Sequence, residues 1–174
     1  PEYIQVLIDL LNQNHYNAYV VGGAIRNALL GLPIHDYDLT TDATPDEMLQ
    51  VFSSYRLFKT GIQHGTITVL SNGQPVEITT FRSENTYEDH RRPSGVSFSD
   101  NIEEDCKRRD FTINALCYNQ SEGLIDFFGG IEDLQHKIIR CIGNANERID
   151  EDALRILRAL RFAGRLSFTI EVNT

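Results

Sequence analysis

Asp36 and Asp38, two positions apart, are the residues whose types and spacing most directly suggest chemistry in this sequence. Residues 35–40 alternate between polar and apolar side chains, which predicts a half-buried strand. Residues i and i+2 of a strand project from the same face, so the two carboxylates should lie side by side. Adjacent carboxylates repel each other unless a cation or a proton lies between them, and oxygen ligands suit Mg²⁺. The alternative is a surface strand whose polar residues simply face water.

Gly22 and Gly23 follow a short apolar run and precede a helical pattern. Glycine lets the backbone approach a phosphate closely, and a helix N-terminus offers free N–H donors to an anion. Arg26, about one turn into the predicted helix, could add a bidentate phosphate contact. The spacing matches neither the P-loop nor the dinucleotide-binding pattern. A phosphate-binding turn and an ordinary strand-to-helix turn are therefore both compatible with these residues.

Two further places carry candidate site residues. Glu77 lies on a predicted strand that could pair beside the aspartate strand, as a third carboxylate near the metal or as an ordinary exposed residue. Residues 107–110 place three cations just before a helix start. Arg109 is a candidate ligand for phosphate or ribose, and Asp110 is a candidate helix cap. A basic cluster is otherwise a solvated face.

The longest helical pattern covers residues 150–165 and has a polar stripe with a spacing of three. An aspartate and an arginine on one rigid helix can offer acceptor and donors to a base edge. The alternative is an i,i+3 ion pair on a solvated helix. The polar stripe consists of Asp152, Arg155, Arg158 and Arg161, and the predicted core face of the same helix consists of Leu154, Leu157 and Leu160.

The elements that must position these residues follow from periodicity, caps and turns. Thr44, Pro45 and Glu47 form a capping-box helix start, and Asn72-Gly73 marks a hairpin turn. The predicted helices are 2–12, 24–30, 45–53, 111–118 and 150–165, with a further small helix after Gly129-Gly130. The predicted strands are 18–21, 35–40, 64–70, 75–81, 124–128 and 138–142. The polar stretch 82–101 is expected to be a long mobile loop.

The chain has 174 residues, a formal net charge of −9 and a hydrophobic content of 41%. Three cysteines without C-x-x-C spacing argue against a zinc site or disulfides, and predict reduced thiols in the cytoplasm. No apolar run approaches the roughly 18 residues that span a bilayer, and no leader is recognisable, so no membrane association is expected. An acidic chain binds nucleic acid poorly without specificity, so an RNA role must rest on a local basic surface or on further domains.

Several of these segments occur together in a specific order. They read GGAIRN, HDYDLTT, HGTITV, VEITTF, RRDFTINAL, DFFGG and EDALRILRALRF. The series resembles the class II tRNA nucleotidyltransferases, the CCA-adding enzymes of the polymerase-β superfamily. The resemblance implies an α/β (α+β) fold, with a small mixed sheet backed by helices. It also implies a nucleotidyltransferase head domain over 1–142 and the start of a helical neck domain over 143–174, with body and tail domains outside this sequence.

The resemblance implies addition of CMP and AMP from CTP and ATP to the 3′ end of tRNA without a nucleic-acid template. Asp36 and Asp38 resemble the catalytic pair that binds two Mg²⁺ ions, and the segment 82–96 corresponds to a flexible loop that changes nucleotide choice. The implied nucleotide-binding residues are Gly22, Gly23 and Arg26 for the triphosphate, Arg109 and Asp110 for the incoming nucleotide, Asp152 and Arg155 as an amino-acid template, and Arg158 and Arg161 as further contacts. Asn27 departs from the family, where aspartate is common.

Three alternatives stay open at this point. A bacterial poly(A) polymerase, or an enzyme adding only CC or only A, would share the same head motifs. A non-catalytic module that binds nucleotide or RNA would keep the fold without needing paired metal ligands. A sugar-nucleotide transferase could use the Asp36 and Asp38 pair without depending on Arg155. No stable protein partner is expected in any of these cases.

Overall fold

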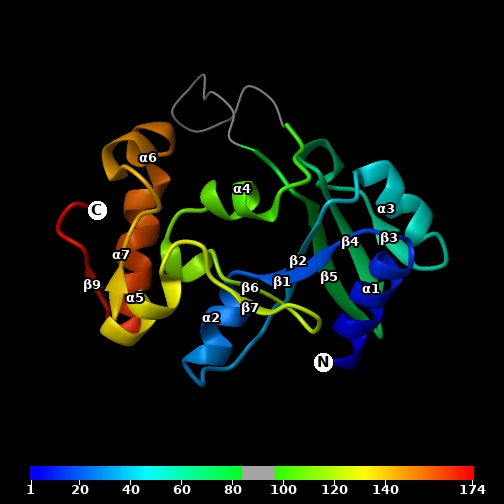
Figure 1. Ribbon diagram of the computed structural model, residues 1–174, viewed down its shortest axis with the longest axis horizontal. Coiled ribbons are helices and arrows are strands. Elements are labelled where there is room, and N and C mark those ends of the chain that lie inside the picture. Colours follow the sequence, from blue (N-terminus) through cyan, green and yellow to red (C-terminus); the bar gives the residue numbers. More distant parts are fainter. Residues whose placement is uncertain (84–96) are drawn as a thin grey trace.

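The computed structural model describes residues 1–83 and 97–174. Within them, seven strands form one mixed sheet in the order β3-β4-β5-β2-β1-β6-β7, with helices packed around it (Figure 1). The strands are β1 (Ala18–Val21), β2 (Asp38–Thr41), β3 (Arg56–Phe58), β4 (Thr66–Ser71), β5 (Gln74–Thr80), β6 (Cys117–Asn119) and β7 (Gly123–Ile125). A separate parallel pair joins β8 (Ile138–Ile139) to β9 (Thr169–Ile170). The predicted α/β class with a small mixed sheet is confirmed.

In Figure 1, α1 and α3 lie on the side of β3 and β4, α5, α6 and α7 lie on the opposite side, and α2 and α4 lie between these two groups. The helices are α1 (Glu2–Gln13), α2 (Gly23–Leu29), α3 (Pro45–Val51), α4 (Ile102–Lys107), α5 (Gly130–His136), α6 (Ala145–Glu151) and α7 (Leu154–Leu166). Two 3₁₀ turns cover Ile62–His64 and Thr112–Asn114. No helix among these residues is long and apolar enough to cross a bilayer.

Strand β1 shows that both faces of the sheet are covered. Its alternate residues Ala18 and Val20 belong to the main core cluster, together with Leu7, Met48, Phe52, Ile67 and Ile78. Tyr19 and Val21 instead pack in a second cluster, with Phe81, Cys106 and Cys117. All four residues of β1 are buried, as expected for a central strand with packing on each side. The sheet is therefore a rigid support for the residues that follow or precede its strands.

The strand register brings Asp38 and Glu77 next to each other in the middle of the sheet, beside the end of β1. Val21, the last residue of β1, pairs with Asp38 at the start of β2. On its other side β2 runs parallel to β5, and Asp38 there pairs with Glu77. Gly22 directly follows Val21, so the glycine turn, the aspartate and the glutamate are neighbours across three adjacent strands. The predicted pairing of the Glu77 strand beside the aspartate strand is confirmed.

Local signals identify several elements correctly. Helix α1 matches the predicted helix 2–12, and the Thr44 capping box is formed with Glu47, with Pro45 opening α3. The Asn72-Gly73 turn joins β4 to β5, which pair antiparallel as predicted. The predicted helix 24–30 is α2, and the small helix after Gly129 is α5. The expected loop lies mostly in 84–96, outside the described residues.

Other predictions are wrong. The segment 111–118 is not a helix, because it forms the 3₁₀ turn and then β6, which pairs with Val20 and Val21 of β1. The predicted strand 35–40 begins only at Asp38, which leaves Asp36 on the preceding segment without regular secondary structure. Helix α4 was not predicted, although Asn101 caps it by accepting from the Glu103 N–H at 2.8 Å. The strands expected at 124–128 and 138–142 are reduced to β7 and the two-residue β8.

The predicted final helix is divided in two. Helix α6 ends at Glu151 and α7 begins at Leu154, with Asp152 extended between them (φ −146°, ψ 98°). The leucine stripe of α7 is not a core face, since Leu154, Leu157 and Leu160 are exposed by 43%, 63% and 57%. Arg155, Ala159 and Phe162 are buried instead. Helix α7 therefore packs through the face that carries Phe162, which contacts Phe111 edge-to-face with ring centroids 5.9 Å apart.

Candidate active site

Asp38 lies at the start of β2, between Val21 of β1 and Glu77 of β5. Its side chain remains accessible to solvent, and Glu77 is adjacent on β5. Partial desolvation raises the pKa of Asp38, Glu77 and Asp36 raise it further, and Arg109 acts in the opposite direction. These are acidic groups that repel one another without a cation between them. Their oxygen donors fit a divalent ion that completes its shell with phosphate oxygens and water. Among the described residues, no group of three His, Cys, Asp or Glu side chains forms a metal site.

The glycine turn, Gly22-Gly23, lies directly beside Asp38, because Gly22 follows Val21, the strand partner of Asp38. Gly22 has φ +70°, a conformation that favours glycine, and its N–H donates to the Leu116 carbonyl at 3.1 Å. A Cβ built on Gly22 would lie 3.3 Å from Nη1 of Arg109. The missing side chain therefore lets the Arg109 guanidinium lie against the backbone at the start of α2.

Arg26 is buried, with 5% of its surface exposed, and two asparagines hold its guanidinium. Its Nη1 donates to Asn114 Oδ1 at 2.5 Å, while Nε and Nη2 donate to Asn27 Oδ1 at 3.2 and 2.9 Å. The Phe162 ring lies 5.0 Å from its Cζ. Burial lowers the pKa of Arg26, and Arg165 and Arg161 nearby lower it further. The Asn27 amide thus orients Arg26 without neutralising its charge.

Asp110 connects this arginine to α7. Its Oδ1 accepts from the Phe111 N–H at 2.8 Å and from Asn114 Nδ2 at 3.0 Å. Its Oδ2 accepts from Arg158 Nε at 2.7 Å and Nη2 at 2.5 Å. A continuous series of hydrogen bonds therefore runs from Arg26 through Asn114 and Asp110 to Arg158. Asp110 serves this network, because the helix that it was predicted to cap is absent.

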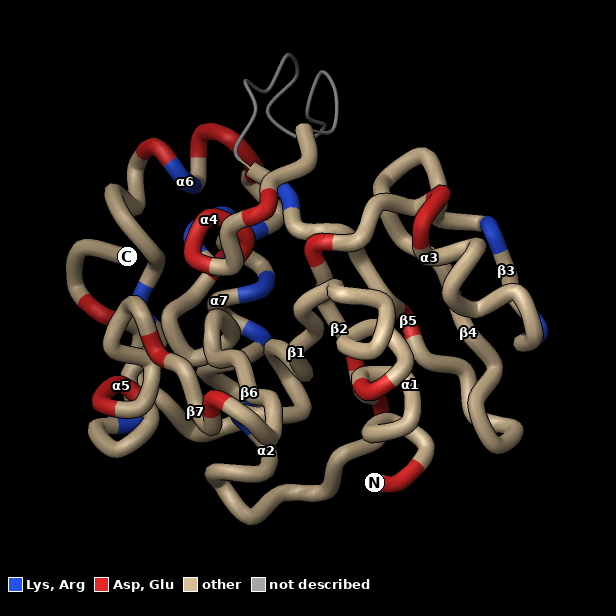
Figure 2. The backbone as a smooth tube through the Cα atoms, turned by 45° about the vertical axis from the view of Figure 1, so that its right-hand side comes forward, with Lys and Arg blue, Asp and Glu red and all other residues tan. Residues whose placement is uncertain are grey.

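These residues surround a cavity of about 370 Å³. Its lining contains six arginines, namely Arg26, Arg108, Arg109, Arg158, Arg161 and Arg165, together with Gly22, Gly23, Asp38, Asp110, Asn114 and Phe162. A second hollow of about 200 Å³ shares Gly23, Arg26, Asp38 and Arg165 and adds Asp36 and His35. Figure 2 shows basic positions gathered around α4 and α7. A chain of net charge −9 thus concentrates positive charge in a single cavity, which suits an anionic ligand.

Asp152 and Arg155 do not line either hollow. Asp152 Oδ1 accepts from the Leu154 N–H at 3.0 Å, which starts α7. Arg155 is buried, and its Nη1 donates to the Arg148 carbonyl at 2.6 Å and to Glu151 Oε2 at 2.9 Å. The structure therefore brings Arg158 and Arg161 of the predicted polar stripe to the cavity, and leaves the predicted template pair outside its lining.

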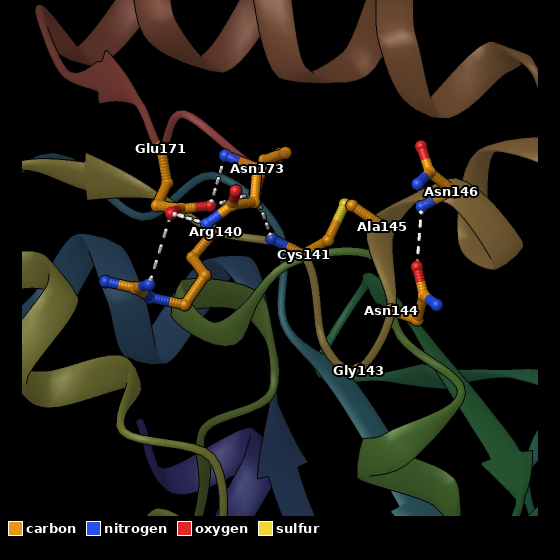
Figure 3. Close-up of a pocket in the computed structure, with 9 residues that line it drawn as sticks. Arg140, Cys141, Gly143, Asn144, Ala145, Asn146, Glu171 and Asn173 are labelled. Atoms are coloured by element: carbon orange, nitrogen blue, oxygen red, sulfur yellow. Dashed lines mark hydrogen bonds and ion pairs between the residues drawn. The ribbon is translucent and has the colours of Figure 1, made fainter.

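A third hollow, of about 280 Å³, lies away from these residues (Figure 3). Arg140 and Glu171 face each other across it at 3.8 Å, and Asn173 Nδ2 donates to Glu171 Oε1 at 2.9 Å. Its charged groups are already paired with each other, and it contains none of the predicted site residues. It offers no comparable excess of one charge.

Sequence reasoning missed several cavity residues. Asn114 could have been found from its position four residues after Asp110, within the same RRDFTINAL segment. Phe162 follows Arg158 by four residues on α7, but an aromatic in a helix is usually assigned to the core. Arg108 and Arg165 also line the cavity, and only their charge in the sequence could have suggested this.

Comparisons with known proteins show the family to which the chain belongs. A family model described as the poly A polymerase head domain matches residues 18–140. The CCA-adding enzyme of Streptococcus mutans is 53% identical over 159 residues, covering 91% of this chain and 39% of that protein. The CCA-adding enzyme of Ligilactobacillus salivarius is 49% identical over 168 residues, covering 97% and 41%. The chain thus spans about two fifths of the curated relatives that it matches.

Solved structures show the same similarity. The Bacillus stearothermophilus CCA-adding enzyme in complex with CTP superposes with a TM-score of 0.90 at 40% identity, over 99% of this chain and 41% of that one. A tRNA nucleotidyltransferase complexed with a primer tRNA and an incoming ATP analog superposes with a TM-score of 0.77 at 32% identity, over 97% and 47%. The similarity therefore covers both parts of the chain, the sheet and the helices α6 and α7.

Proposed function

Because the chain belongs to the family of the poly A polymerase head domain, we propose that it is the nucleotide-transferring part of a CCA-adding enzyme. In this proposal it transfers CMP and AMP from CTP and ATP to the 3′ end of tRNA. The observation that carries the proposal is the cavity, where six arginines surround the end of the strand that begins with Asp38. Positive charge for a triphosphate and carboxylates for a cation are thereby adjacent, as nucleotidyl transfer requires.

The triphosphate would lie against the Gly22 turn, between Arg26 and Arg109. Nucleotidyltransferases of this family generally use divalent metal ions. Mg²⁺ held by Asp36 and Asp38, with Glu77 adjacent, would activate the attacking hydroxyl and neutralise charge on the leaving group. The tRNA 3′-oxygen forms a bond to the α-phosphorus, its proton is released, and the bond to the pyrophosphate oxygen breaks. The protein mainly aligns these groups and supplies cations.

Base selection is proposed for α7 and the residues that precede it. Arg158 lines the cavity and is fixed by Asp110, so it can present donors in a constant place. Asp152 and Arg155 remain candidates for the template pair, and this role requires Arg155 to leave Glu151 and turn toward the cavity. We also propose a domain boundary near residue 142 and a cytoplasmic location, as the sequence suggests.

The test combines binding and transfer. Calorimetry on the 174-residue chain should detect Mg²⁺-dependent binding of CTP and of ATP. Single-turnover reactions on tRNA that ends before CCA, with each nucleotide offered separately, should show CMP addition first and AMP addition second. Asp38→Ala should abolish transfer and largely spare nucleotide binding, whereas Asp46→Ala on an exposed turn of α3 should leave both unchanged.

Each alternative has its own outcome. Long tails made from ATP alone would assign a poly(A) polymerase. Nucleotide binding without transfer, even at saturating tRNA, would favour the non-catalytic module. Transfer that survives Asp38→Ala would refute the metal assignment. Absence of both CTP and ATP binding would refute the proposed function itself.

A further inference from the structure

Asp105 on α4 is a fully buried carboxylate, with 0% of its surface exposed. Its Oδ1 accepts from Arg108 Nε at 2.8 Å and Nη2 at 2.6 Å, and from the Arg82 N–H at 3.2 Å. Its Oδ2 accepts from Arg109 Nη2 at 3.0 Å and from Thr40 Oγ1 at 3.3 Å. A buried charge is tolerated only when it is paired and hydrogen-bonded, and these contacts satisfy both oxygens. Asp105 takes no part in the chemistry proposed above.

The contacts of Asp105 connect the strand that carries Asp38 to two arginines of the cavity. Thr40 lies on β2 two residues after Asp38, so its backbone belongs to the strand that carries the proposed metal ligand. Arg108 and Arg109 follow α4 and line the cavity. One carboxylate thereby fixes two cavity arginines relative to the aspartate strand.

Arg109 depends on this contact for its orientation. Its Nε is buried and has no hydrogen-bond partner among the described residues. Its Nη1 lies 3.3 Å from where a Cβ on Gly22 would be, so this end of the guanidinium lies against the glycine turn. The ion pair of Nη2 with Asp105 fixes the other end. Asp38 lines the same cavity as Arg109, so a second carboxylate lies within the space that the guanidinium faces.

We propose that Asp105 is a positioning residue, which holds the Arg109 guanidinium over the Gly22 turn so that it meets the incoming triphosphate instead of turning toward Asp38. The inference rests on the proposed function, because it assigns nucleotide binding to the same cavity. It extends that function to a side chain that touches neither nucleotide nor metal.

Because Asp105 is charged, the direction in which its neutralisation changes CTP affinity tests the proposal. Removing a negative charge near an anion site should tighten anion binding if the carboxylate acts only through its long-range field. A positioning role predicts the opposite, because Arg109 loses its fixed place when the carboxylate is neutralised. The direction of the change in CTP affinity therefore separates the two roles.

The experiment compares Asp105→Asn with Glu103→Gln in the 174-residue chain. Glu103 lies on the same helix at an exposed position, so its substitution removes the same charge without touching Arg109. Calorimetry with CTP and Mg²⁺ should give a dissociation constant about tenfold higher for Asp105→Asn, as expected for one misplaced charge-assisted contact, and an unchanged value for Glu103→Gln. Circular dichroism and melting temperature verify that each variant is folded. Unchanged or tighter CTP binding by folded Asp105→Asn would overturn the proposal.

A double-mutant cycle locates the effect at Arg109. In an Arg109→Met background, Asp105→Asn should weaken CTP binding by less than it does in the wild-type background, because one of the two cavity arginines that it holds is gone. An equal loss in both backgrounds would overturn the proposal. If Asp105→Asn does not fold, Asp105→Glu replaces it, since it keeps the charge and displaces the guanidinium, and wild-type affinity in that variant would overturn the proposal equally. Failure of the wild-type chain to bind CTP would instead refute the proposed function, so the two failures are distinguishable.

Discussion

Replacing Asn114 by leucine removes the amide that joins Arg26 to Asp110. Asn114 Oδ1 accepts from Arg26 Nη1 at 2.5 Å, and its Nδ2 donates to Asp110 Oδ1 at 3.0 Å. The side chain is buried, with 7% exposed, so water cannot easily replace the lost partners. Leucine is close to asparagine in size and has no polar atom, so the substitution removes two hydrogen bonds without opening a large cavity.

The expected loss follows from these two contacts. A hydrogen bond to a charged group contributes about 1.5–3 kcal/mol, so two of them correspond to about 3–6 kcal/mol. Arg26 still donates to Asn27, and Asp110 still accepts from Arg158. The expected loss in the free energy of unfolding is therefore about 3 kcal/mol. Domains are stable by about 5–15 kcal/mol, so the variant should fold with a much smaller margin.

Urea unfolding followed by circular dichroism measures this loss. With an m-value of about 2 kcal/mol/M, a loss of about 3 kcal/mol lowers the urea midpoint by about 1.5 M. Asn12→Leu on an exposed turn of α1 is the matched control, and its midpoint should stay close to that of the wild type. An Asn114→Leu midpoint indistinguishable from that of Asn12→Leu would refute the view that this amide holds the network together.

Three further results are expected. Burial would raise the pKa of Asp105, but the ion pairs with Arg109 and Arg108 bring that pKa below the ordinary value of 3.8. The ionised carboxylate therefore stabilises the fold at pH values above 3.8. This contribution to stability is lost as the pH falls through the lowered pKa. The urea-midpoint difference between wild type and Asp105→Asn should accordingly shrink from about pH 6 to about pH 3, and a constant difference would contradict this. The Cys106 and Cys117 sulfurs are 3.0 Å apart, and this contact together with burial raises the pKa of Cys117, so aromatic disulfide reagents should modify the pair only after unfolding. Gly130→Ala should cost about 1–3 kcal/mol in urea unfolding, because its Cβ would overlap the Thr112 carbonyl, whereas Gly164→Ala meets open space on α7 and should be neutral or slightly stabilising.

Local signals predicted those elements whose cause is local. The capping box of Thr44 and Glu47 involves residues three apart, and the Asn72-Gly73 turn selects its own hairpin. The same holds for α1, whose regularly spaced residues Ile4, Leu7, Ile8 and Leu11 are buried in the core. In each case the residues that determine the element lie within it, so no knowledge of the rest of the chain is needed.

Elements determined by distant partners were not predicted. The segment after Asp110 forms a turn because Asn114 bonds to Arg26, 88 residues away in sequence. Helix α7 has the expected periodicity, but periodicity does not specify which stripe is covered. The covered stripe is the one that carries Arg155, Ala159 and Phe162, and Arg158 beside it pairs with the distant carboxylate of Asp110.

The same distinction applies to the site. The sequence placed the glycine turn, Arg26, Asp38 and Arg109 together, because each belongs to a motif with a stated chemistry. It did not identify Asp105, since a buried carboxylate resembles an exposed one until the helix that carries it is known. The interrupted helix at Asp152 was also missed, because its cause is the extended backbone conformation at that residue.

The cavity draws its wall from Gly22 near one end of the chain and Arg165 near the other. No fragment of the fold can therefore contain a complete binding site, and the site exists only when the sheet and α7 are both in place. A nucleotide that binds there stabilises the native chain by RT ln(1 + [L]/Kd), about 2.7 kcal/mol at a hundredfold excess over Kd. A nucleotide bound in this cavity would contact residues from both ends of the chain, so the chain should resist unfolding most strongly while the nucleotide is bound.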